Sequence, residues 1–288
     1  MTVSQIRELL TPKSIAILGA GNNLQKMGTH HALSIINDGF KGRVYPIHPK
    51  EKTVLGINAY QRIADLPEVP DLALFIIPAV HVPGLLEEFG KLGTKYAVII
   101  TAGFKETGKE GIALENRIKA IAETYHMRFV GPNCIGVINS DISMNTTVHP
   151  MARKPGGLGL ISQSGTYVAQ ALTYLEERGI RFSKAVSVGN ETSVSLTDVL
   201  EYMGEDDQTK AIALYIEGVR DVRRFLETAR RISKKKPIVA QYTGGSGAGA
   251  RSSLGHTGAM AGPDHLYDGL FAQAGIIRVS TKIGRAHV

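Results

Sequence analysis

The sequence of 288 residues has a single cysteine and no long apolar run. A lone Cys134 excludes an internal disulfide and a cysteine-based metal cluster, and it suits a reducing compartment. No apolar stretch approaches the ~20 residues that cross a bilayer, and the first ten residues lack the apolar core of a signal peptide. We therefore expect a cytoplasmic protein with no membrane segment and no metal site.

The charge of the chain is modest and dispersed. Lys and Arg number 33 against 26 Asp and Glu, which gives a formal net charge of +7. The densest basic run, at 234–236, is typical of a helix C-terminus, where cations meet the negative end of the helix dipole. Because no aromatic residues alternate with this run, the sequence predicts no nucleic-acid partner.

Short apolar runs, glycine-containing turns and amphipathic segments alternate along the chain. This alternation is typical of parallel sheets covered by helices, so we predict an α/β fold. In the first half, it predicts strands at 14–19, 43–47, 72–76, 96–100 and 128–130, and helices at 27–38, 82–92 and 110–125. In the second half, it predicts strands at 158–161, 185–188, 211–215, 237–241 and 276–279, and helices at 166–178, 196–203, 222–234 and 265–274.

The alternation breaks at residues 132–156, which contain three prolines and show no clear period. This break predicts a linker between a Rossmann-like domain at 1–131 and a second α/β domain at 157–282. No residue-level repeat relates the two halves, so we expect two separate domains.

The last six residues, 283–288, resemble the translation of a sequencing adaptor. We expect a non-native tail there, with the native protein continuing beyond Lys282. A genuine tail is the alternative.

A glycine loop follows the first predicted strand and reads Gly-Ala-Gly-Asn from Gly19 to Asn22, with the second glycine at Gly21. Glycines let the backbone approach a phosphate, and the next helix offers free N–H groups. The third glycine of the dinucleotide fingerprint is absent from its usual place, and no acidic residue ends the second strand, as NAD binding would require. Lys50 follows that strand instead and favours CoA or NADP. A structural turn is the alternative.

Three further loops follow predicted strands of the first half. They carry Pro78, then Thr101 and Ala102, then Asn133 and Cys134. Ligands of open α/β sheets bind at these strand ends, so the loops should gather around one ligand. By its chemistry alone, Cys134 is equally a small buried residue.

The loop 162–166 reads Ser-Gln-Ser-Gly-Thr, between a predicted strand and a predicted helix. Hydroxyls and a glycine at a helix N-terminus form an anion site, for which we select Ser164, Gly165 and Thr166. The loop also resembles a nucleophile-serine turn, but Leu160 stands where that motif has glycine. A simple helix N-cap is the alternative.

A glycine-rich segment at 243–262 contains one histidine, His256, without a nearby second metal ligand. A neutral imidazole is a nucleophile near pH ~7, and the small flanking residues leave room for a phosphoryl group. Glu217 follows the predicted strand 211–215, and its carboxylate could hold the imidazole in one tautomer. A loop hydrogen bond for His256 and a solvated side chain for Glu217 are the alternatives.

Together these motifs resemble the α subunit, or the fused N-terminal half, of ADP-forming acetyl-CoA (acyl-CoA) synthetases in the succinyl-CoA synthetase superfamily. The resemblance rests on SIAILGA, IPA, TAGF, GPNCIGV, ISQSGT, SVGN, ALYIEGVRD and SSLGHTGAMAG, which occur in the expected order up to Lys282. It implies a Rossmann-like CoA-binding domain followed by a flavodoxin-like, succinyl-CoA synthetase-like domain. It also implies an acid–thiol ligase (acetate–CoA ligase, ADP-forming) that converts acyl-CoA, ADP and phosphate into free acid, CoA and ATP.

The resemblance implies a role for each candidate residue. His256 carries the phosphoryl group, Glu217 orients the imidazole of His256, and residues 164–166 hold phosphate. The residues placed against CoA are Gly19, Gly21, Asn22, Lys50, Pro78, Thr101, Ala102, Asn133 and Cys134. Because the sequence shows no ATP-grasp site or Walker A pattern, the resemblance implies an ATP-grasp subunit or domain outside this chain, with Mg²⁺ and ADP or ATP. It also implies an oligomer.

The sequence departs from succinate-using relatives at two places. Asn22 and Asn23 stand where those relatives have Gly-Ser, which leaves the CoA contacts there open. Ala169 stands where a tyrosine contacts succinate in those relatives, which argues against a dicarboxylate and leaves the small carboxylic acid unidentified.

Three other functions compete with the ligase. They are a protein acetyltransferase fusion that uses the same domains, an NAD(P)-dependent Rossmann oxidoreductase, and a non-catalytic CoA-binding regulator. The intact motif around His256 argues against the first, because such fusions often lose this histidine.

Overall fold

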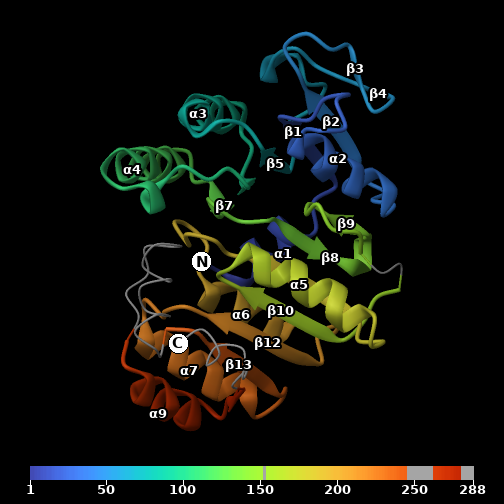
Figure 1. The fold of residues 1–288 in the computed structure, drawn as a ribbon. Coiled ribbons are helices and arrows are strands. Elements are labelled where there is room, and N and C mark those ends of the chain that lie inside the picture. The colour runs from blue at the N-terminus through green and yellow to red at the C-terminus, as the bar shows by residue number, and fades with distance from the viewer. Residues whose placement is uncertain (152–153, 245–261, 280–288) are drawn as a thin grey trace.

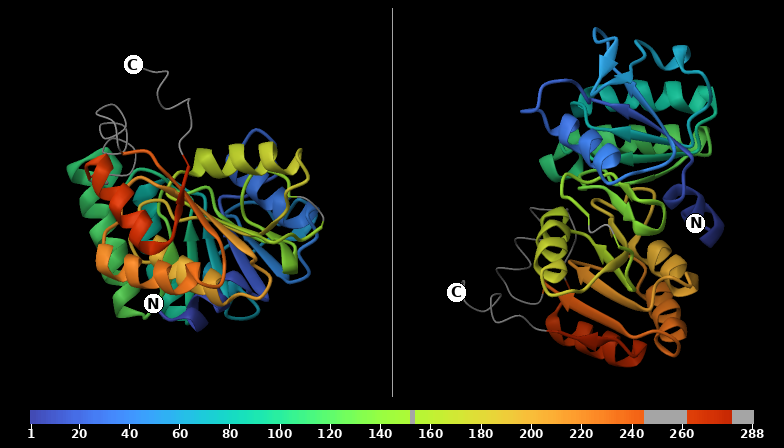
Figure 2. Two further views of the ribbon diagram at one scale, coloured as in Figure 1. Left: turned by 90° about the horizontal axis from the view of Figure 1, so that it is seen from below. Right: turned by 90° about the vertical axis from the view of Figure 1, so that its right-hand side faces the viewer.

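Two mainly parallel sheets organise the chain, one in each half (Figure 1). The computed structural model describes residues 1–151, 154–244 and 262–279. The two halves lie one above the other in the second view of Figure 2, and the N-terminal helix lies next to the second half. Within the described ranges, every helix is too short or too polar to cross a membrane.

The first sheet contains five parallel strands in the order β2-β1-β5-β6-β7. They are β1 (Ser14–Leu18), β2 (Arg43–Ile47), β5 (Leu72–Phe75), β6 (Tyr96–Ile99) and β7 (Arg128–Val130). Helix α2 (Met27–Asn37) covers one face, and α3 (Val82–Leu92) and α4 (Lys109–Thr124) pack side by side on the other. Because both faces are covered, β1, β5 and β6 are buried along their whole length and are almost entirely apolar.

The second sheet contains seven strands in the order β14-β13-β12-β10-β11-β8-β9. Its parallel strands are β10 (Leu158–Ser162), β11 (Phe182–Ser187), β12 (Ala211–Ile216), β13 (Ile238–Tyr242) and β14 (Ile277–Arg278). Helix α5 (Gly165–Glu176) covers one face, and the opposite face carries α6 (Leu196–Glu205), α7 (Val222–Ser233) and α9 (Asp264–Ala274). The predicted α/β fold with parallel sheets is confirmed.

Every predicted strand and helix is present, with bounds within two residues except at the start of β11, which begins at 182 rather than 185. The prediction omitted α1 (Val3–Leu10) and the short hairpin of β3 (Thr53–Val54) and β4 (Ile57–Asn58). A capping box between Thr2 and Gln5 starts α1, and its apolar side packs against α6. One helix of eight residues is too short to show a clear period in the sequence.

Residues 132–156, for which the sequence predicts a linker, contain regular structure. Strand β8 (Val137–Asn139), η4 (Ser140–Ile142) and β9 (Met144–Asn145) lie in this segment. Strand β8 pairs antiparallel with β11, and β9 extends the same sheet to its edge, where it contacts α2 of the first half. Strands this short carry no readable period, so the sequence could not predict them; the domain boundaries themselves stay a prediction.

A buried histidine lies where α2 meets the residues after β9. His31 is 1% exposed, and its Nδ1 lies 2.6 Å from the carbonyl oxygen of Thr146. Burial lowers the pKa of His31 to about 4; the Thr146 hydrogen bond opposes this shift, and the charges of His30 and His149 add to it. The imidazole is therefore neutral in the folded protein at neutral pH.

We expect His31 to reduce stability in mild acid. In the unfolded chain His31 takes up a proton below its ordinary pKa of 6.5, whereas in the folded chain it stays neutral down to about 4, its lowered pKa. Between these two pH values protonation therefore stabilises the unfolded state relative to the folded one. Between pH ~7.5 and pH ~4.5 this one group should cost about 2.5 kcal/mol of unfolding free energy. Urea unfolding at both pH values checks this, and His31→Gln should lose correspondingly less. The same pH dependence in both proteins would contradict it.

Candidate functional site

The two sheets share one strand order, which gives each of them a ligand edge. Counted along the chain, the parallel strands of both sheets follow the order 2-1-3-4-5. Where the connections from two neighbouring strands run in opposite directions, a crevice opens at the carboxyl ends, and ligands of open α/β sheets bind there. This point lies between β1 and β5 in the first sheet and between β10 and β12 in the second.

The glycine loop after β1 packs directly on its neighbours. Gly19 has a φ of +99°, and a Cβ there would lie 2.0 Å from the carbonyl oxygen of Ile76. A Cβ on Gly28, in α2, would lie 2.1 Å from the Gly19 carbonyl oxygen. Gly28 therefore allows the close helix packing that the third glycine of the fingerprint provides, at a longer spacing that the sequence reasoning missed.

Gly21 faces the side chain of His48. A Cβ on Gly21 would lie 3.7 Å from His48 Nε2. His48 Nδ1 accepts hydrogen bonds from the backbone N–H groups of Glu51 (2.9 Å) and Lys50 (3.3 Å). A neutral imidazole that accepts at Nδ1 carries its proton on Nε2, so His48 presents a donor toward the glycine loop. Lys50 is exposed beside it. The sequence reasoning selected Lys50 and missed His48, two residues earlier.

The side chain of Asn22 is engaged within the protein. Its amide group donates to the carbonyl oxygen of Thr53 (2.9 Å) and to the carboxylate of Glu51 (3.2 Å). Its oxygen accepts from the N–H of Leu55 (2.9 Å). These bonds tie the glycine loop to the β3–β4 hairpin, so Asn22 holds the shape of the loop.

The strand-end loops of the first half lie side by side, as the sequence predicts. Pro78 and Ala102 are exposed after β5 and β6, and Thr101 is half-buried. Thr101 Oγ1 donates to the carbonyl oxygen of Ile77 at 2.7 Å and joins the two strand ends. The N–H of Asn133 donates to the carbonyl oxygen of Thr101 at 2.9 Å, which brings the third loop to the same edge.

Cys134 is buried at this edge, and its thiol donates to the carbonyl oxygen of Ile99 at 3.3 Å. Burial raises the pKa of Cys134 to about 12, against a weaker effect of a backbone hydrogen bond from Gly136. The thiol is therefore protonated at neutral pH and is no nucleophile. These contacts fit the interpretation of Cys134 as a small packing residue.

Strand β10 leads into α5 through a turn in which both serine hydroxyls bond to the backbone. Ser164 caps the helix by accepting from the N–H of Tyr167 at 3.4 Å. Ser162 Oγ donates to the carbonyl oxygen of Ser164 at 2.7 Å and accepts from its N–H at 3.1 Å. Gly165 begins the helix, and Thr166 is exposed next to it. Ser164 is thus an N-cap at a helix start, which is also where an anion would bind.

Glu217 directly follows β12 and is 4% exposed. Strands β10 and β12 are parallel neighbours, and Ser162 pairs with Tyr215 at the end of their shared ladder. The serine turn and Glu217 therefore leave adjacent strands at the same edge, at the switch point of the second sheet. His256 lies outside the described residues, so its position is not part of this geometry.

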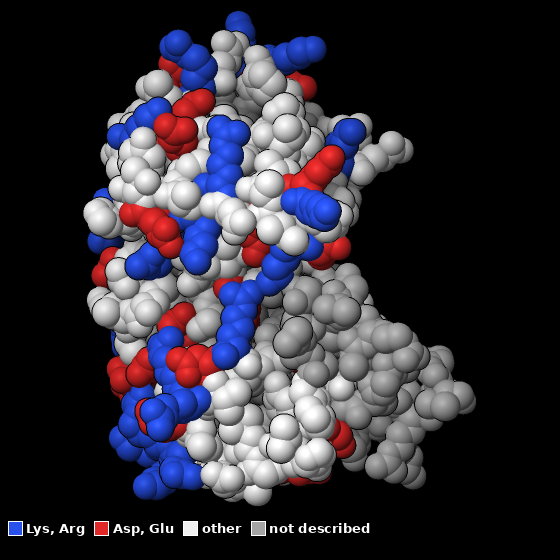
Figure 3. Space-filling view, turned by 90° about the vertical axis from the view of Figure 1, so that its left-hand side faces the viewer, with Lys and Arg blue, Asp and Glu red and all other residues white. Residues whose placement is uncertain are grey.

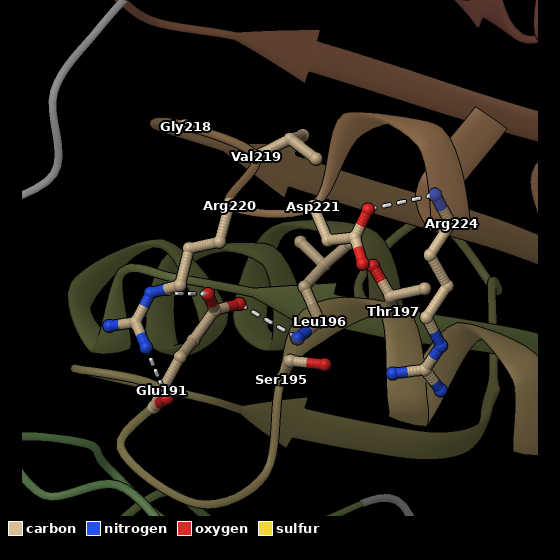
Figure 4. A pocket seen from close by; sticks show the side chains of 9 residues that line it. All are labelled: Glu191, Ser195, Leu196, Thr197, Gly218, Val219, Arg220, Asp221 and Arg224. Carbon is tan, nitrogen blue, oxygen red and sulfur yellow. Dashed lines mark hydrogen bonds and ion pairs between the residues drawn. The ribbon is translucent and has the colours of Figure 1, made fainter. Parts of the chain in front are cut away.

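An ion pair that the sequence reasoning missed lies beside this edge (Figure 4). Glu191 is buried with a φ of +54°, and its carboxylate accepts from the N–H of Leu196 at 2.7 Å and lies 3.7 Å from Arg220 Nε. Burial raises the pKa of Glu191, and the charge of Arg220 opposes this shift. The pair borders a pocket of about 50 Å³ between the loop after β11 and the start of α7. Glu191 directly follows the motif SVGN and Arg220 lies within the motif ALYIEGVRD; both motifs carried the family resemblance, which was the available signal.

Asn190 connects this region to the first half of the chain. Its side-chain amide donates to the carboxylates of Glu106 (2.7 Å) and Glu115 (2.9 Å). The backbone carbonyl oxygen of Asn190 accepts from Lys105 Nζ at 2.7 Å and also from the guanidinium of Arg220. A short chain of polar contacts thus joins the loop after β6 to the loops around the second switch point.

Charged side chains do not form a metal cluster in the part of the chain that the structure describes. On the face shown in Figure 3, Lys and Arg side chains lie among Asp and Glu side chains, which agrees with the dispersed charge expected from the sequence.

Two family models match the chain, one in each half. Residues 13–140 match a CoA binding domain, and residues 155–283 match a succinyl-CoA ligase like flavodoxin domain. The predicted fold class, a CoA-binding domain followed by a succinyl-CoA synthetase-like flavodoxin domain, is confirmed.

Curated ADP-forming CoA ligases are similar to this sequence over nearly its whole length. The ADP-forming acetate–CoA ligase of Methanocaldococcus jannaschii is 43% identical over 96% of the chain, and the α subunit of ADP-forming acetate–CoA ligase II of Pyrococcus furiosus is 40% identical over 94%. A solved structure of Ca. Korarchaeum cryptofilum dinucleotide-forming acetyl-coenzyme A synthetase 1, with phosphate and ADP, matches with a TM-score of 0.91 at 34% identity over 96% of the chain. The chain spans 39%, 59% and 60% of these three proteins, respectively.

Proposed function

The chain is an α-subunit-like homologue of ADP-forming acetyl-CoA synthetases, and we propose that it supplies the CoA and phosphohistidine sites of such a ligase. In the proposed reaction, phosphate attacks the thioester carbonyl of acyl-CoA and expels the CoA thiolate. The histidine then attacks phosphorus in the acyl phosphate and releases the carboxylate. ADP finally takes the phosphoryl group from the histidine, which gives ATP and restores the imidazole.

One observation carries the proposal: the start of α5 and Glu217 leave neighbouring strands at the switch point of the second sheet. A phosphohistidine needs N–H donors for the phosphoryl oxygens and an acceptor for the second imidazole nitrogen. We assign Ser164, Gly165 and Thr166 to the phosphoryl oxygens and the Glu217 carboxylate to the imidazole of His256. The remaining nitrogen of His256 then carries the lone pair that attacks phosphorus.

We assign CoA to the switch point of the first sheet. Gly19 and Gly21 let the backbone approach a phosphate, His48 Nε2 faces them as a donor, and Lys50 adds a positive charge. Asn22 holds this loop. The residues assigned to the remainder of CoA are Pro78, Thr101, Ala102 and Asn133, with Cys134 packed behind them.

The nucleotide site is assigned to a partner. Because the chain spans only 39–60% of the similar proteins, we propose that an ATP-grasp domain or subunit completes the enzyme and binds ADP or ATP with Mg²⁺. The acid is a small carboxylic acid, and acetate is the substrate named for the relatives above.

Reconstitution tests this function. The chain mixed with a matching ATP-grasp subunit should form ATP from acetyl-CoA, ADP and phosphate, and neither protein should do so alone. Calorimetric titration of the chain with CoA and with NAD(P) separates the ligase from an oxidoreductase. Binding of NAD(P) instead of CoA, or no ATP from the mixture, would overturn the proposal.

We expect Lys50→Glu to weaken CoA binding. The change places a negative charge near anionic phosphates, and solvent screening at this exposed position should limit the cost to ~1–2 kcal/mol, or about tenfold in Kd. Lys119→Glu is the matched control, since Lys119 is an exposed lysine on α4, away from the glycine loop. An equal Kd for Lys50→Glu and the control would remove Lys50 from the site.

A further inference from the structure

The side chain of Gln163 bridges the ends of two strands. Its Oε1 accepts from the backbone N–H groups of Glu217 (2.5 Å) and Gly218 (3.1 Å). Its Nε2 donates to the carbonyl oxygen of Gly218 at 2.7 Å. Gln163 is 4% exposed, so water does not replace these bonds readily.

These three bonds continue the connection between β10 and β12 beyond the last hydrogen-bonded pair of the two strands. The last paired residues of β10 and β12 are Ser162 and Tyr215, so the backbone at Glu217 has no ladder partner on the β10 strand. A primary amide has a donor and an acceptor side by side, so the Gln163 side chain can bond at the same time to the N–H and to the carbonyl oxygen of Gly218. The amide thereby fixes the backbone from which the Glu217 side chain projects.

Gln163 also influences the ion pair beside the site. Together with the charge of Arg220, its side chain opposes the rise that burial causes in the pKa of Glu191. Arg220 lies two residues after Gly218 on the same loop. Gln163 therefore fixes the backbone of the loop that carries both Glu217 and Arg220, the cation that pairs with Glu191.

We infer that Gln163 is a positioning residue for phosphoryl transfer, which acts by fixing the backbone of Glu217 and, through it, the carboxylate that orients His256. This inference rests on the proposed function. Gln163 itself takes no part in bond making, so its loss should slow formation of the phosphohistidine and leave CoA binding intact.

The test measures single-turnover labelling of the chain by radioactive ATP with the ATP-grasp partner. Gln163→Leu keeps the volume and removes all three bonds, and it should slow labelling at least about tenfold with an unchanged Kd for CoA.

Gln163→Glu is a conservative rescue. Its ionised form loses the donor and places a charge beside Glu217, whereas its protonated form regains a donor and an acceptor. Labelling by Gln163→Glu should therefore rise as pH falls, and labelling by Gln163→Leu should not.

A matched control separates positioning from stability. Asn139 is also a buried amide that donates to a backbone carbonyl, that of Leu10, and it lies at the other end of the second half. Asn139→Leu should lower the urea midpoint as Gln163→Leu does, but label at the wild-type rate. Equal labelling rates in Gln163→Leu and wild type would overturn the inference. No labelling of the wild type would instead overturn the proposed function, so the two failures are distinct.

Discussion

Replacing His256 by asparagine is expected to abolish phosphorylation of the chain. Incubation with the ATP-grasp partner, magnesium and labelled ATP should leave label on the wild type and none on His256→Asn, because asparagine keeps a polar side chain but has no nucleophilic nitrogen. The label on the wild type should be labile in acid and stable in alkali, since a phosphoramidate hydrolyses once its nitrogen is protonated. The expected loss is complete, and CoA binding should persist.

Two variants bracket this result. Glu217→Gln should slow labelling without abolishing it, because the change disturbs the orientation and charge of the imidazole's partner and leaves the attacking atom in place. His265→Asn is the matched control, since His265 is an exposed histidine at the start of α9, and it should label as the wild type does. Acid-stable label, or label on His256→Asn, would move the nucleophile elsewhere, with Ser164 the next candidate.

The sequence predicted the parts of the fold that local chemistry determines. Strands such as Leu72–Phe75 are buried on both faces, so their apolar runs are visible without a structure. The same holds for Gly19 and Ser164, whose backbone conformation or helix cap depends on immediate neighbours. Because parallel strands gather their carboxyl ends at one edge, those loops could also be placed together in advance.

The sequence could not predict contacts between distant residues. Gln163 bonds to the backbone of Glu217, 54 positions later, and Asn190 bonds to Glu106, 84 positions earlier. In both cases a side-chain amide bonds to groups that only the folded arrangement brings within reach, namely the backbone of Glu217 for Gln163 and a carboxylate for Asn190. A glutamine or asparagine in a loop has no pattern that distinguishes this role from a solvated one. His48 was missed for a related reason, since its tautomer follows from two backbone N–H groups of a turn.

The shared strand order explains why the two proposed sites have the same construction. In each sheet the first strand ends in a turn that opens a helix, and the third strand lies next to it and ends in the opposing loop. This shared construction supports the proposal that each switch point binds a phosphate-bearing ligand through backbone N–H groups. The second site differs because it contains Glu217, a buried carboxylate. In a site that held only an anion, this carboxylate would repel the ligand. That residue favours a site in which a histidine stands between carboxylate and phosphate.

The second large effect is expected at a buried ion cluster far from both sites. Lys184, on β11, is 1% exposed, and its ammonium group lies 2.7 Å from Asp141 and 2.9 Å from Asp206. Asp206 also accepts from the N–H and hydroxyl of Thr209. Burial alone would raise the pKa of Asp206, but the bonds from Thr209 and Lys184 lower it below its ordinary value, so the carboxylate is charged at neutral pH.

We expect Asp206→Ala to destabilise the protein by about 3 kcal/mol, because it leaves a buried ammonium group with one half-exposed partner and removes two further hydrogen bonds. Urea unfolding at neutral pH measures the loss. Asp65→Ala is the matched control: Asp65 also pairs with a cation, Arg62, but both side chains reach solvent, so the loss should be clearly smaller than that of Asp206→Ala. Similar losses of unfolding free energy in the two variants would mean that burial does not increase the contribution of the Lys184–Asp206 pair to stability. A loss for Asp206→Ala with an unchanged Kd for CoA would place this cluster in the stability of the second sheet and outside ligand binding.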